Sequence, residues 1–364
     1  MIKDDCLYFR GEKPCRFKIL CDNCSHYQPF PTRILIIKCA AQGDVLRTTP
    51  LLSGLKRKYP QSHINWLVAE ESKELLTNNS SIDKIITFNL NNLIPLVIEE
   101  FDILICLDKE PSSTSIATLI KAPQKFGFGL NKFGNLIIFN KASEYAYRLG
   151  IDDSLKFQQN KKTYQQIIYE MAELDYQRDT YQFYLRKEDK KKAEDFYQKN
   201  KISKKKLAVG LNTGSGKRFK TKQWPQENFL KLIHYLKTDL KANVFLLGGQ
   251  AEKAINSYLA RKSAAKVYNT GHDNSLREFA GFIAMMDVVV SSDTLAMHLA
   301  IALKKRVVAL FGPTAPQEID LYGRGIKIFA GVPCSPCYLS TCPDGKCMKA
   351  ITPELVLEKI KTII

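Results

Sequence analysis

Short apolar runs, each ending in a polar turn and followed by a helical pattern, recur along most of this chain. Residues 288–314 show the pattern most clearly: residues 288–291 and 307–311 are apolar runs, and a helical pattern follows Asp293. Buried parallel strands have this continuous apolar character, because helices cover both faces of their sheet. The alternation of strands and helices therefore predicts an α/β fold built on parallel sheets.

The alternation occurs twice along the 364 residues, a length that fits two domains of about 150–200 residues each. Expected strands lie at residues 33–38, 63–68, 84–88, 102–107, 207–212, 244–247, 266–268, 288–291 and 307–311. A lysine-rich stretch at 187–206 separates the halves. We therefore expect two Rossmann-like, doubly wound domains at residues 31–195 and 196–364, after a cysteine-containing extension at 1–30. The first strand lacks the Gly-x-Gly-x-x-Gly of dinucleotide sites, so the predicted ligand lies in a cleft between the domains.

Composition and charge limit where such a chain acts. A hydrophobic content of 45% and a charged content of 25% are those of a soluble globular protein, and no apolar run approaches the roughly 20 residues of a membrane helix. The N-terminus lacks the apolar core of a signal peptide, so we expect a cytoplasmic protein. The net charge of +17 indicates either a solvated lysine-rich surface or one that docks on anionic lipid. Nucleic acid is not an expected partner, since no nucleic-acid motif accompanies the charge.

The first expected strand is followed by a turn that contains Gly43 and the polar residue Asp44. Gly43 permits a turn that other residues would resist, and Asp44 stands at the mouth of the next helical pattern. Aspartate at that place is commonly an N-cap. Alternatively Asp44 is a general base, a role for which partial burial would have to raise its pKa toward neutrality.

A second polar group lies in the loop 212–218, which contains Thr213 and Ser215 and precedes Lys222. Backbone N–H groups and hydroxyls can hold the oxygens of a diphosphate, and a lysine can offset its charge. The spacing of a P-loop is missing, so this is not a Walker site. A plain surface loop is the alternative.

Two further polar groups follow strands in the second half. Gly248 ends an apolar run where a nucleoside can approach the backbone, and Glu252 either accepts bonds from ribose hydroxyls or begins a helix as an acidic first-turn residue. Asp293 and Thr294 stand at a helix mouth, with His298 one turn further on the same side. A lone helical histidine is more often structural than functional.

Taken together, these segments resemble the bacterial heptosyltransferases of glycosyltransferase family 9, which add heptose to the lipopolysaccharide core. The matching segments are Gly43-Asp44, Lys222-x-Trp224-Pro225, Gly248-Gly249, Asp293-Thr294-x3-His298 and Phe311-Gly312-Pro313-Thr314. The resemblance implies a GT-B fold, two Rossmann-like domains facing a central cleft, which agrees with the layout above. It also implies inverting transfer of heptose from ADP-heptose without a catalytic metal, onto a lipopolysaccharide core or related lipid-linked glycan.

The resemblance assigns a role to each matching residue. Asp44 is the implied general base for the acceptor hydroxyl, and Lys222 the implied cation that stabilises the departing diphosphate. The implied donor-binding residues are Thr213, Ser215, Gly248, Glu252, Asp293, Thr294 and His298. Many members have glycine after Asp-Thr, whereas this chain has Leu295, which narrows the donor pocket and leaves the sugar open.

The implied partners are a nucleotide sugar and an anionic lipid-linked glycan, met by a cytoplasmic protein peripheral to the inner membrane. The alternatives are a transferase with another nucleotide sugar or a protein acceptor, and a non-catalytic nucleotide-sugar-binding protein of the same fold.

The ten cysteines include a cluster at each end of the chain. Cys6, Cys15, Cys21 and Cys24 precede the first strand, and residues 334–347 carry a Cys-x2-Cys-x4-Cys-x4-Cys pattern. In a cytoplasmic protein such clusters indicate metal or free thiols rather than disulfides, and the two-residue spacing is typical of zinc knuckles. We expect a structural zinc on the N-terminal four, with His26 as a spare ligand. The C-terminal pattern fits iron, zinc, reduced thiols or disulfides.

Overall fold

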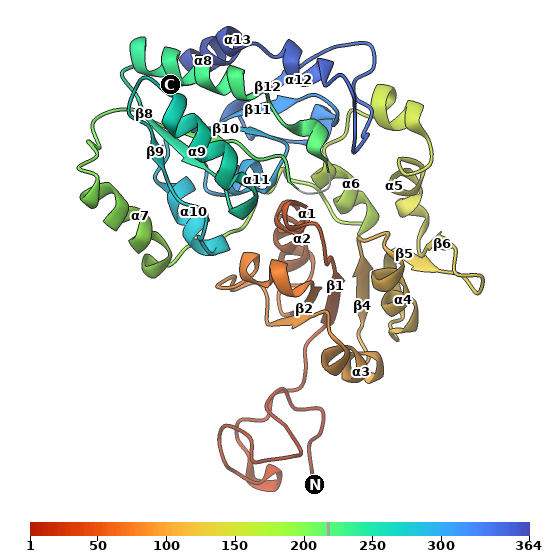
Figure 1. The fold of residues 1–364 in the computed structure, drawn as a ribbon. Helices are drawn as coiled ribbons and strands as arrows, with labels where there is room; N and C mark the ends of the chain where they lie inside the picture. Colours follow the sequence, from red (N-terminus) through yellow and green to blue (C-terminus); the bar gives the residue numbers. More distant parts are fainter. Residues whose placement is uncertain (217–218) are drawn as a thin grey trace.

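The computed structural model describes residues 1–216 and 219–364 and contains two six-stranded sheets (Figure 1). The first sheet has the order β3-β2-β1-β4-β5-β6, and only β6, of its described strands, runs antiparallel to its neighbour. Its strands are β1 (Arg33–Ile37), β2 (His63–Val68), β3 (Lys84–Thr87), β4 (Ile103–Cys106), β5 (Gln124–Leu130) and β6 (Leu136–Ile138). Its helices are α1 (Gln42–Thr48), α2 (Leu51–Lys58), α3 (Leu90–Ile98), α4 (Pro111–Leu119), α5 (Glu144–Arg148) and α6 (Tyr164–Met171).

The second sheet repeats the same order with parallel strands, β12-β11-β10-β7-β8-β9. Its strands are β7 (Ala208–Asn212), β8 (Asn243–Leu247), β9 (Tyr268–Asn269), β10 (Val288–Ser292), β11 (Arg306–Phe311) and β12 (Gly325–Phe329). The accompanying helices are α7 (Lys187–Lys199), α8 (Gln226–Thr238), α9 (Lys253–Lys262), α10 (Leu276–Ala284), α11 (Leu295–Ala302), α12 (Lys346–Ala350) and α13 (Pro353–Lys361). The prediction of two doubly wound domains is therefore confirmed.

The apolar runs are strands because both faces of each sheet are covered. In β1 the four residues Ile34–Ile37 have no exposed surface, and in β10 Val288–Val290 have none either. Apolar packing also continues from one domain into the other: Val45 and Leu46 of α1 belong to the same buried cluster as Met297 and Leu299 of α11. Helices α1 and α11 therefore pack against each other at the domain junction.

The lysine-rich stretch contains a helix rather than only a linker. Helix α7 buries Ala193 and Tyr197 and packs on α10, which places it with the second sheet. The expected domain boundary between residues 195 and 196 therefore falls inside this helix. Its two buried apolar residues are four apart on one face, a short apolar stripe within a mostly charged segment.

Candidate active site

Each sheet has a point where its strand order reverses, and polar residues follow the strands at both points. Strand β1 pairs with both β2 and β4, and β7 pairs with both β8 and β10. Ligands of open α/β sheets bind outside the carboxyl ends of strands at such points. Asp44 follows β1 and Asp293 follows β10. Because α1 packs on α11, the two edges meet at the domain junction.

The contact between the edges is made by Gly43 and the ring of His298. A Cβ atom on Gly43 would stand 2.6 Å from Cδ2 of that ring. His298 is 4% exposed; its Nδ1 lies 3.3 Å from the Tyr181 hydroxyl and its Nε2 lies 3.7 Å from Oδ1 of Asp293. Gly43 lies within α1 and is not among the described residues with positive φ. Glycine is therefore required here for the close approach of the ring, not for an unusual turn as expected.

Asp44 stands in the first turn of α1 and forms an ion pair within its own helix. Its Oδ1 lies 2.9 Å from Nε of Arg47, whose Nη1 lies 3.6 Å from Oε2 of Glu318 in the other domain. Burial alone would raise the pKa of Asp44, but the charges of Arg47, Lys38 and His298 outweigh it and lower the pKa. The general-base role was expected to need a raised pKa, whereas the charges beside this carboxylate lower its pKa in the ligand-free structure.

Lys38 directly follows strand β1, at the same edge of the first sheet as Asp44. Its side chain is 7% exposed, and its Nζ lies 2.5 Å from Oδ1 of Asp108, the residue two positions after β4. Asp108 also accepts hydrogen bonds from Cys39 N at 2.6 Å and Ser113 Oγ at 3.1 Å. Burial would lower the pKa of Lys38, but Tyr164, Asp108 and Asp44 raise it, so the ammonium stays charged. Sequence reasoning missed this buried pair, which fixes the turn that carries Asp44.

Lys222 and Asp293 meet at the second edge. Lys222 ends the short helix η5 (Lys220–Lys222), and its Nζ donates to the Asp293 carbonyl oxygen at 2.7 Å and lies 3.4 Å from Oδ2. Burial would raise the pKa of Asp293, but His298, Lys222 and Arg47 hold it far below its usual range. The structure thus brings Lys222, predicted in a separate segment, to Asp293 and His298, which the sequence already placed at one helix mouth.

The loop after β7 is tied to the start of α11. Asn212 Nδ2 lies 3.2 Å from both Ser291 Oγ and Thr294 Oγ1. Thr213 Oγ1 donates to Asn256 Oδ1 at 2.6 Å, so in this arrangement its proton is already engaged. Ser215, in the same loop, is 9% exposed. The cations that complete the expected phosphate loop, Lys217 and Arg218, lie outside the described residues.

Glu252 stands at the start of a short helix, the structural alternative that the sequence suggested. Its Oε2 accepts a hydrogen bond from Gly249 N at 2.8 Å, which caps the short helix η6 (Gln250–Glu252). Its Oε1 faces the loop after β7, where a Cβ on Gly214 would stand 2.4 Å away. A Cβ on Gly248 would likewise stand 2.6 Å from Glu252 Cβ. Both glycines make room for this carboxylate, and one of its oxygens lies outside the capping bond.

Two other residues of the matching motifs are structural. Trp224 is 2% exposed, and its Nε1 donates to the Ile351 carbonyl oxygen at 2.9 Å. A Cβ on Gly312 would stand 2.6 Å from Sδ of Met348 and 2.8 Å from Sγ of Cys347. These motif positions therefore hold the C-terminal segment against the second sheet.

Comparison with known protein families identifies the family to which a chain with this fold and these polar strand ends belongs. The profile of glycosyltransferase family 9 (heptosyltransferase) matches residues 95–348, well over half of the chain. The chain belongs to glycosyltransferase family 9. The resemblance read from the motifs is confirmed, and the two domains are those of the GT-B fold.

Named family 9 members differ in how much of their length is matched. Lipooligosaccharide heptosyltransferase 2 of Campylobacter jejuni (serotype O:6) is 28% identical over 164 residues, 43% of this chain and 52% of that protein. This chain thus matches only about half of that relative. The Haemophilus influenzae protein of the same name is 24% identical, with 91% and 99% covered. The structure of the ADP-heptose lps heptosyltransferase II of Escherichia coli has a TM-score of 0.66 at 19% identity, covering 91% of this chain and 98% of that one.

Proposed function

We propose that this protein transfers a heptose, with inversion, from ADP-heptose to the lipopolysaccharide core or a related lipid-linked glycan. The observation that carries the proposal is the meeting of two strand-order reversals at one junction: Asp44 from the first domain, and Lys222 with Asp293 from the second. The names of the Haemophilus and Escherichia relatives support heptose and ADP as the transferred sugar and the carrier.

The second edge suits the nucleotide diphosphate. Asn212 holds Thr294 at the N-terminus of α11, and the unpaired N–H groups of such a terminus attract phosphate. Lys222 then offsets the negative charge that grows on the β-phosphate as ADP leaves. The carboxylate of Asp293 holds Lys222 in place before the donor arrives. The free oxygen of Glu252 is positioned to accept a bond from a ribose hydroxyl.

The first edge suits the acceptor. The acceptor hydroxyl attacks C1 of the donor sugar from the face opposite the phosphate, and the new C1–O bond forms as the old one breaks. The bonding electron pair departs with ADP, and the hydroxyl proton passes to Asp44. The diphosphate brings negative charge toward the cations that lower the pKa of Asp44. Donor binding therefore makes this carboxylate a stronger base.

Titration calorimetry against ADP, ADP-heptose, UDP and GDP tests the donor assignment. We expect ADP and ADP-heptose to bind selectively, and the Asp293→Ala variant to lose about tenfold or more in affinity, because Lys222 and His298 lose their common partner. Asp239→Ala is the control, since Asp239 pairs with Lys361 away from the junction. Preference for UDP or GDP would refute ADP-heptose, and an absence of nucleotide binding would refute the transferase itself.

Lys109 is our candidate contact for an anionic group of the acceptor. It follows β4, next to the β1 edge that carries Asp44, and its Nζ donates to the Ala146 carbonyl oxygen at 2.7 Å. Burial of the ammonium group, followed by the positive charge of Lys156, lowers the pKa of Lys109 to about 8. The negative charges of Glu318 and Glu110 act in the opposite direction but do not outweigh these effects. An anion bound beside Lys109 would stabilise its charged ammonium group and so oppose the lowering of its pKa.

The expected pH profile follows from the sign of that shift. As pH rises through about 8 the ammonium loses its charge, so kcat/KM for the acceptor should fall, by up to about tenfold per pH unit. The Lys109→Arg variant keeps its charge and should keep its acceptor affinity up to pH 9 or so. Steady-state kinetics at varied acceptor concentration measure both. An unchanged alkaline limb in Lys109→Arg would exclude Lys109 as the acceptor contact.

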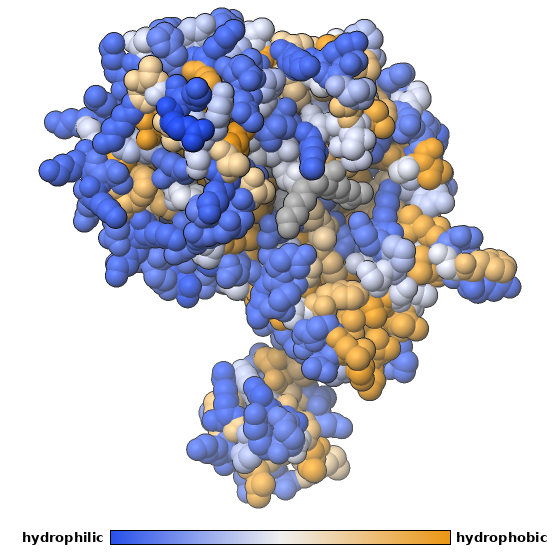
Figure 2. All heavy atoms as spheres, in the orientation of Figure 1, coloured by the Kyte–Doolittle hydropathy of each residue, from blue (hydrophilic) through white to orange (hydrophobic). Residues whose placement is uncertain are grey.

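An exposed apolar stripe supports peripheral contact with the cytoplasmic face of the inner membrane. Within the described residues no helix is long and apolar enough to cross a bilayer. Helix α3 instead exposes Leu90, Ile94 and Ile98, at 70%, 57% and 74%, beside Leu119 of the neighbouring α4. Figure 2 shows this apolar patch over the α3 and α4 end of the first domain. Apolar side chains at i, i+4 and i+8 on a basic protein fit insertion at an anionic interface.

Replacing Leu90, Ile94 and Ile98 by serine should weaken binding to vesicles with anionic phospholipid at least about tenfold, because each loses buried apolar area. Sedimentation with vesicles measures the binding, and activity on a water-soluble acceptor analogue should be unchanged. Equal vesicle binding by the triple variant would show that this stripe is not the membrane contact.

A further inference from the structure

The N-terminal extension, residues 1–30, has almost no apolar core. Cys6 is the single buried residue among these described positions. The regular structure in the extension consists of the three-residue helix η1 (Cys21–Asn23) and a bridge between Cys6 and Pro29. Figure 1 shows the extension standing apart from both domains. Units of fewer than about 40 residues rarely fold on apolar packing alone and usually need a disulfide, a metal or a partner.

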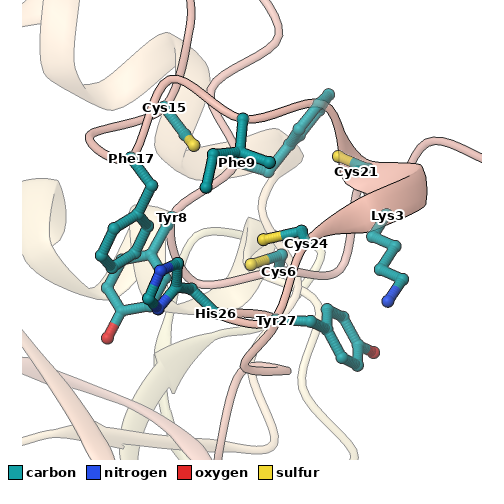
Figure 3. Close-up of a pocket in the computed structure, with 11 residues that line it drawn as sticks. Lys3, Cys6, Tyr8, Phe9, Cys15, Phe17, Cys21, Cys24, His26 and Tyr27 are labelled. Carbon is teal, nitrogen blue, oxygen red and sulfur yellow. The ribbon is translucent and has the colours of Figure 1, made fainter.

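Four thiols line one cavity inside this extension. The cavity has a volume of about 30 Å³, and the cysteines in its wall are Cys6, Cys15, Cys21 and Cys24. Figure 3 shows the sulfur atoms of Cys6 and Cys24 next to each other, with Cys15 and Cys21 on either side. A space of this size is large enough to hold a single ion.

The backbone around these cysteines is folded into tight turns. Cys6, Cys15 and Cys21 each begin one: their carbonyl oxygens accept from Phe9 N at 2.9 Å, Lys18 N at 3.0 Å and Cys24 N at 3.3 Å. Turns of this kind expose successive N–H groups that stabilise nearby negative charge. Three separate turns therefore present cysteines to one cavity from three places along the chain.

We propose that Cys6, Cys15, Cys21 and Cys24 bind one zinc ion as thiolates, and that this ion holds the extension together. Zinc takes four thiolate ligands in tetrahedral geometry at structural sites. Among the described residues no group of three or more histidine, cysteine or acidic side chains is already assembled to hold a metal. In the proposed site each thiol releases one proton as its S–Zn bond forms.

Charge and the neighbouring histidine agree with a site of four sulfurs. Zinc with four thiolates carries a net charge of −2, and the extension supplies cations such as Lys3, which lines the cavity, and Arg16. The His26 ring is stacked on Phe17 with its centroid 4.0 Å away, so its ring is already packed. His26 also lines the cavity, and it remains the expected spare ligand beside the four thiols.

Metal analysis of the full-length chain tests the site. To separate it from the C-terminal thiols, the measurements use a Cys334→Ser/Cys337→Ser background. We expect about one zinc per chain in this protein and less than about a quarter after adding Cys15→Ser, because three ligands bind zinc far more weakly than four. Cys342→Ser, which removes an exposed thiol at the other end, is the matched control and should leave the zinc unchanged.

Cobalt substitution of the same Cys334→Ser/Cys337→Ser chain adds a spectroscopic readout of the N-terminal ligands to which Cys334 and Cys337 do not contribute. Cobalt bound to four thiolates gives intense sulfur-to-metal charge-transfer absorption and tetrahedral d–d bands. Absence of zinc from the Cys334→Ser/Cys337→Ser protein, equal zinc in the Cys15→Ser and Cys342→Ser derivatives, or a disulfide among the four N-terminal cysteines in peptide mapping would each overturn the proposal. None of these readouts depends on sugar transfer, so they stand apart from the proposed function.

Discussion

Replacing Asp44 by asparagine should lower kcat by about 100- to 10,000-fold, the usual contribution of a positioned general base. Asparagine keeps the shape of the side chain but cannot accept the acceptor proton. Loss of the Asp44 carboxylate also removes the ion-pair partner of Arg47, whose Nε lies 2.9 Å from Oδ1 of Asp44. Because the charges of Asp44 and of the diphosphate oppose each other in our proposal, ADP affinity should stay the same or rise, and should not fall.

Single-turnover transfer and ADP titration together check this prediction. Asp239→Asn serves as the control, because that carboxylate pairs with Lys361 on the surface of the second domain. Retained transfer by the Asp44→Asn protein would remove Asp44 as the base. A parallel loss of ADP affinity would instead mean that the carboxylate acts by holding Arg47 and the junction in place.

Lys222→Met should lower kcat by about 100- to 1,000-fold, as expected when one group that stabilises developing charge is removed. Methionine preserves the length of the side chain without its charge. The variant also leaves Asp293 without the ammonium that lies 2.7 Å from its carbonyl oxygen. We therefore expect the loss in kcat to exceed the loss in donor affinity, since the charge on ADP is greatest as the bond to the sugar breaks.

The matched control is Lys220→Met, an exposed lysine in the same short helix. Comparing ADP-heptose with a donor that carries a better leaving group sharpens the test, because such a donor depends less on the cation. A rate for Lys222→Met that equals the wild-type rate would assign the leaving-group role elsewhere. Equal defects with both donors would place Lys222 in ground-state binding only.

The fold was predictable because apolar runs dominate its strands. Residues 34–37 and 288–290 are continuous runs of β-branched and aliphatic residues, and both are fully buried within parallel strands. The ends of these strands placed Asp44 and Asp293 at the correct edges. The helix α7 was harder to place, since its charged sequence hides a short buried stripe of Ala193 and Tyr197.

The electrostatics of the site was not predictable from one segment. Asp44 appeared as a lone carboxylate whose pKa burial would raise, but Lys38 lies beneath it and Arg47 beside it. The partner of Lys38 is Asp108, 70 positions away, and a single lysine after a strand reads as a surface residue. Arg47 reaches Glu318 in the other domain, a contact that only the packing of α1 on α11 creates.

The contact of Gly43 with the His298 ring bears on the order in which substrates bind. The ring touches the helix that carries Asp44 and lies 3.7 Å from Asp293 on the nucleotide side. The His298 ring lies between the two sides, so a change of charge on the nucleotide side alters the pKa of Asp44 in our proposal. In the mechanism proposed above, Asp44 is a weaker base before the nucleotide binds and a stronger one afterwards. We therefore expect the donor to add before the acceptor, so that an acceptor hydroxyl is activated only when a sugar is present to receive it.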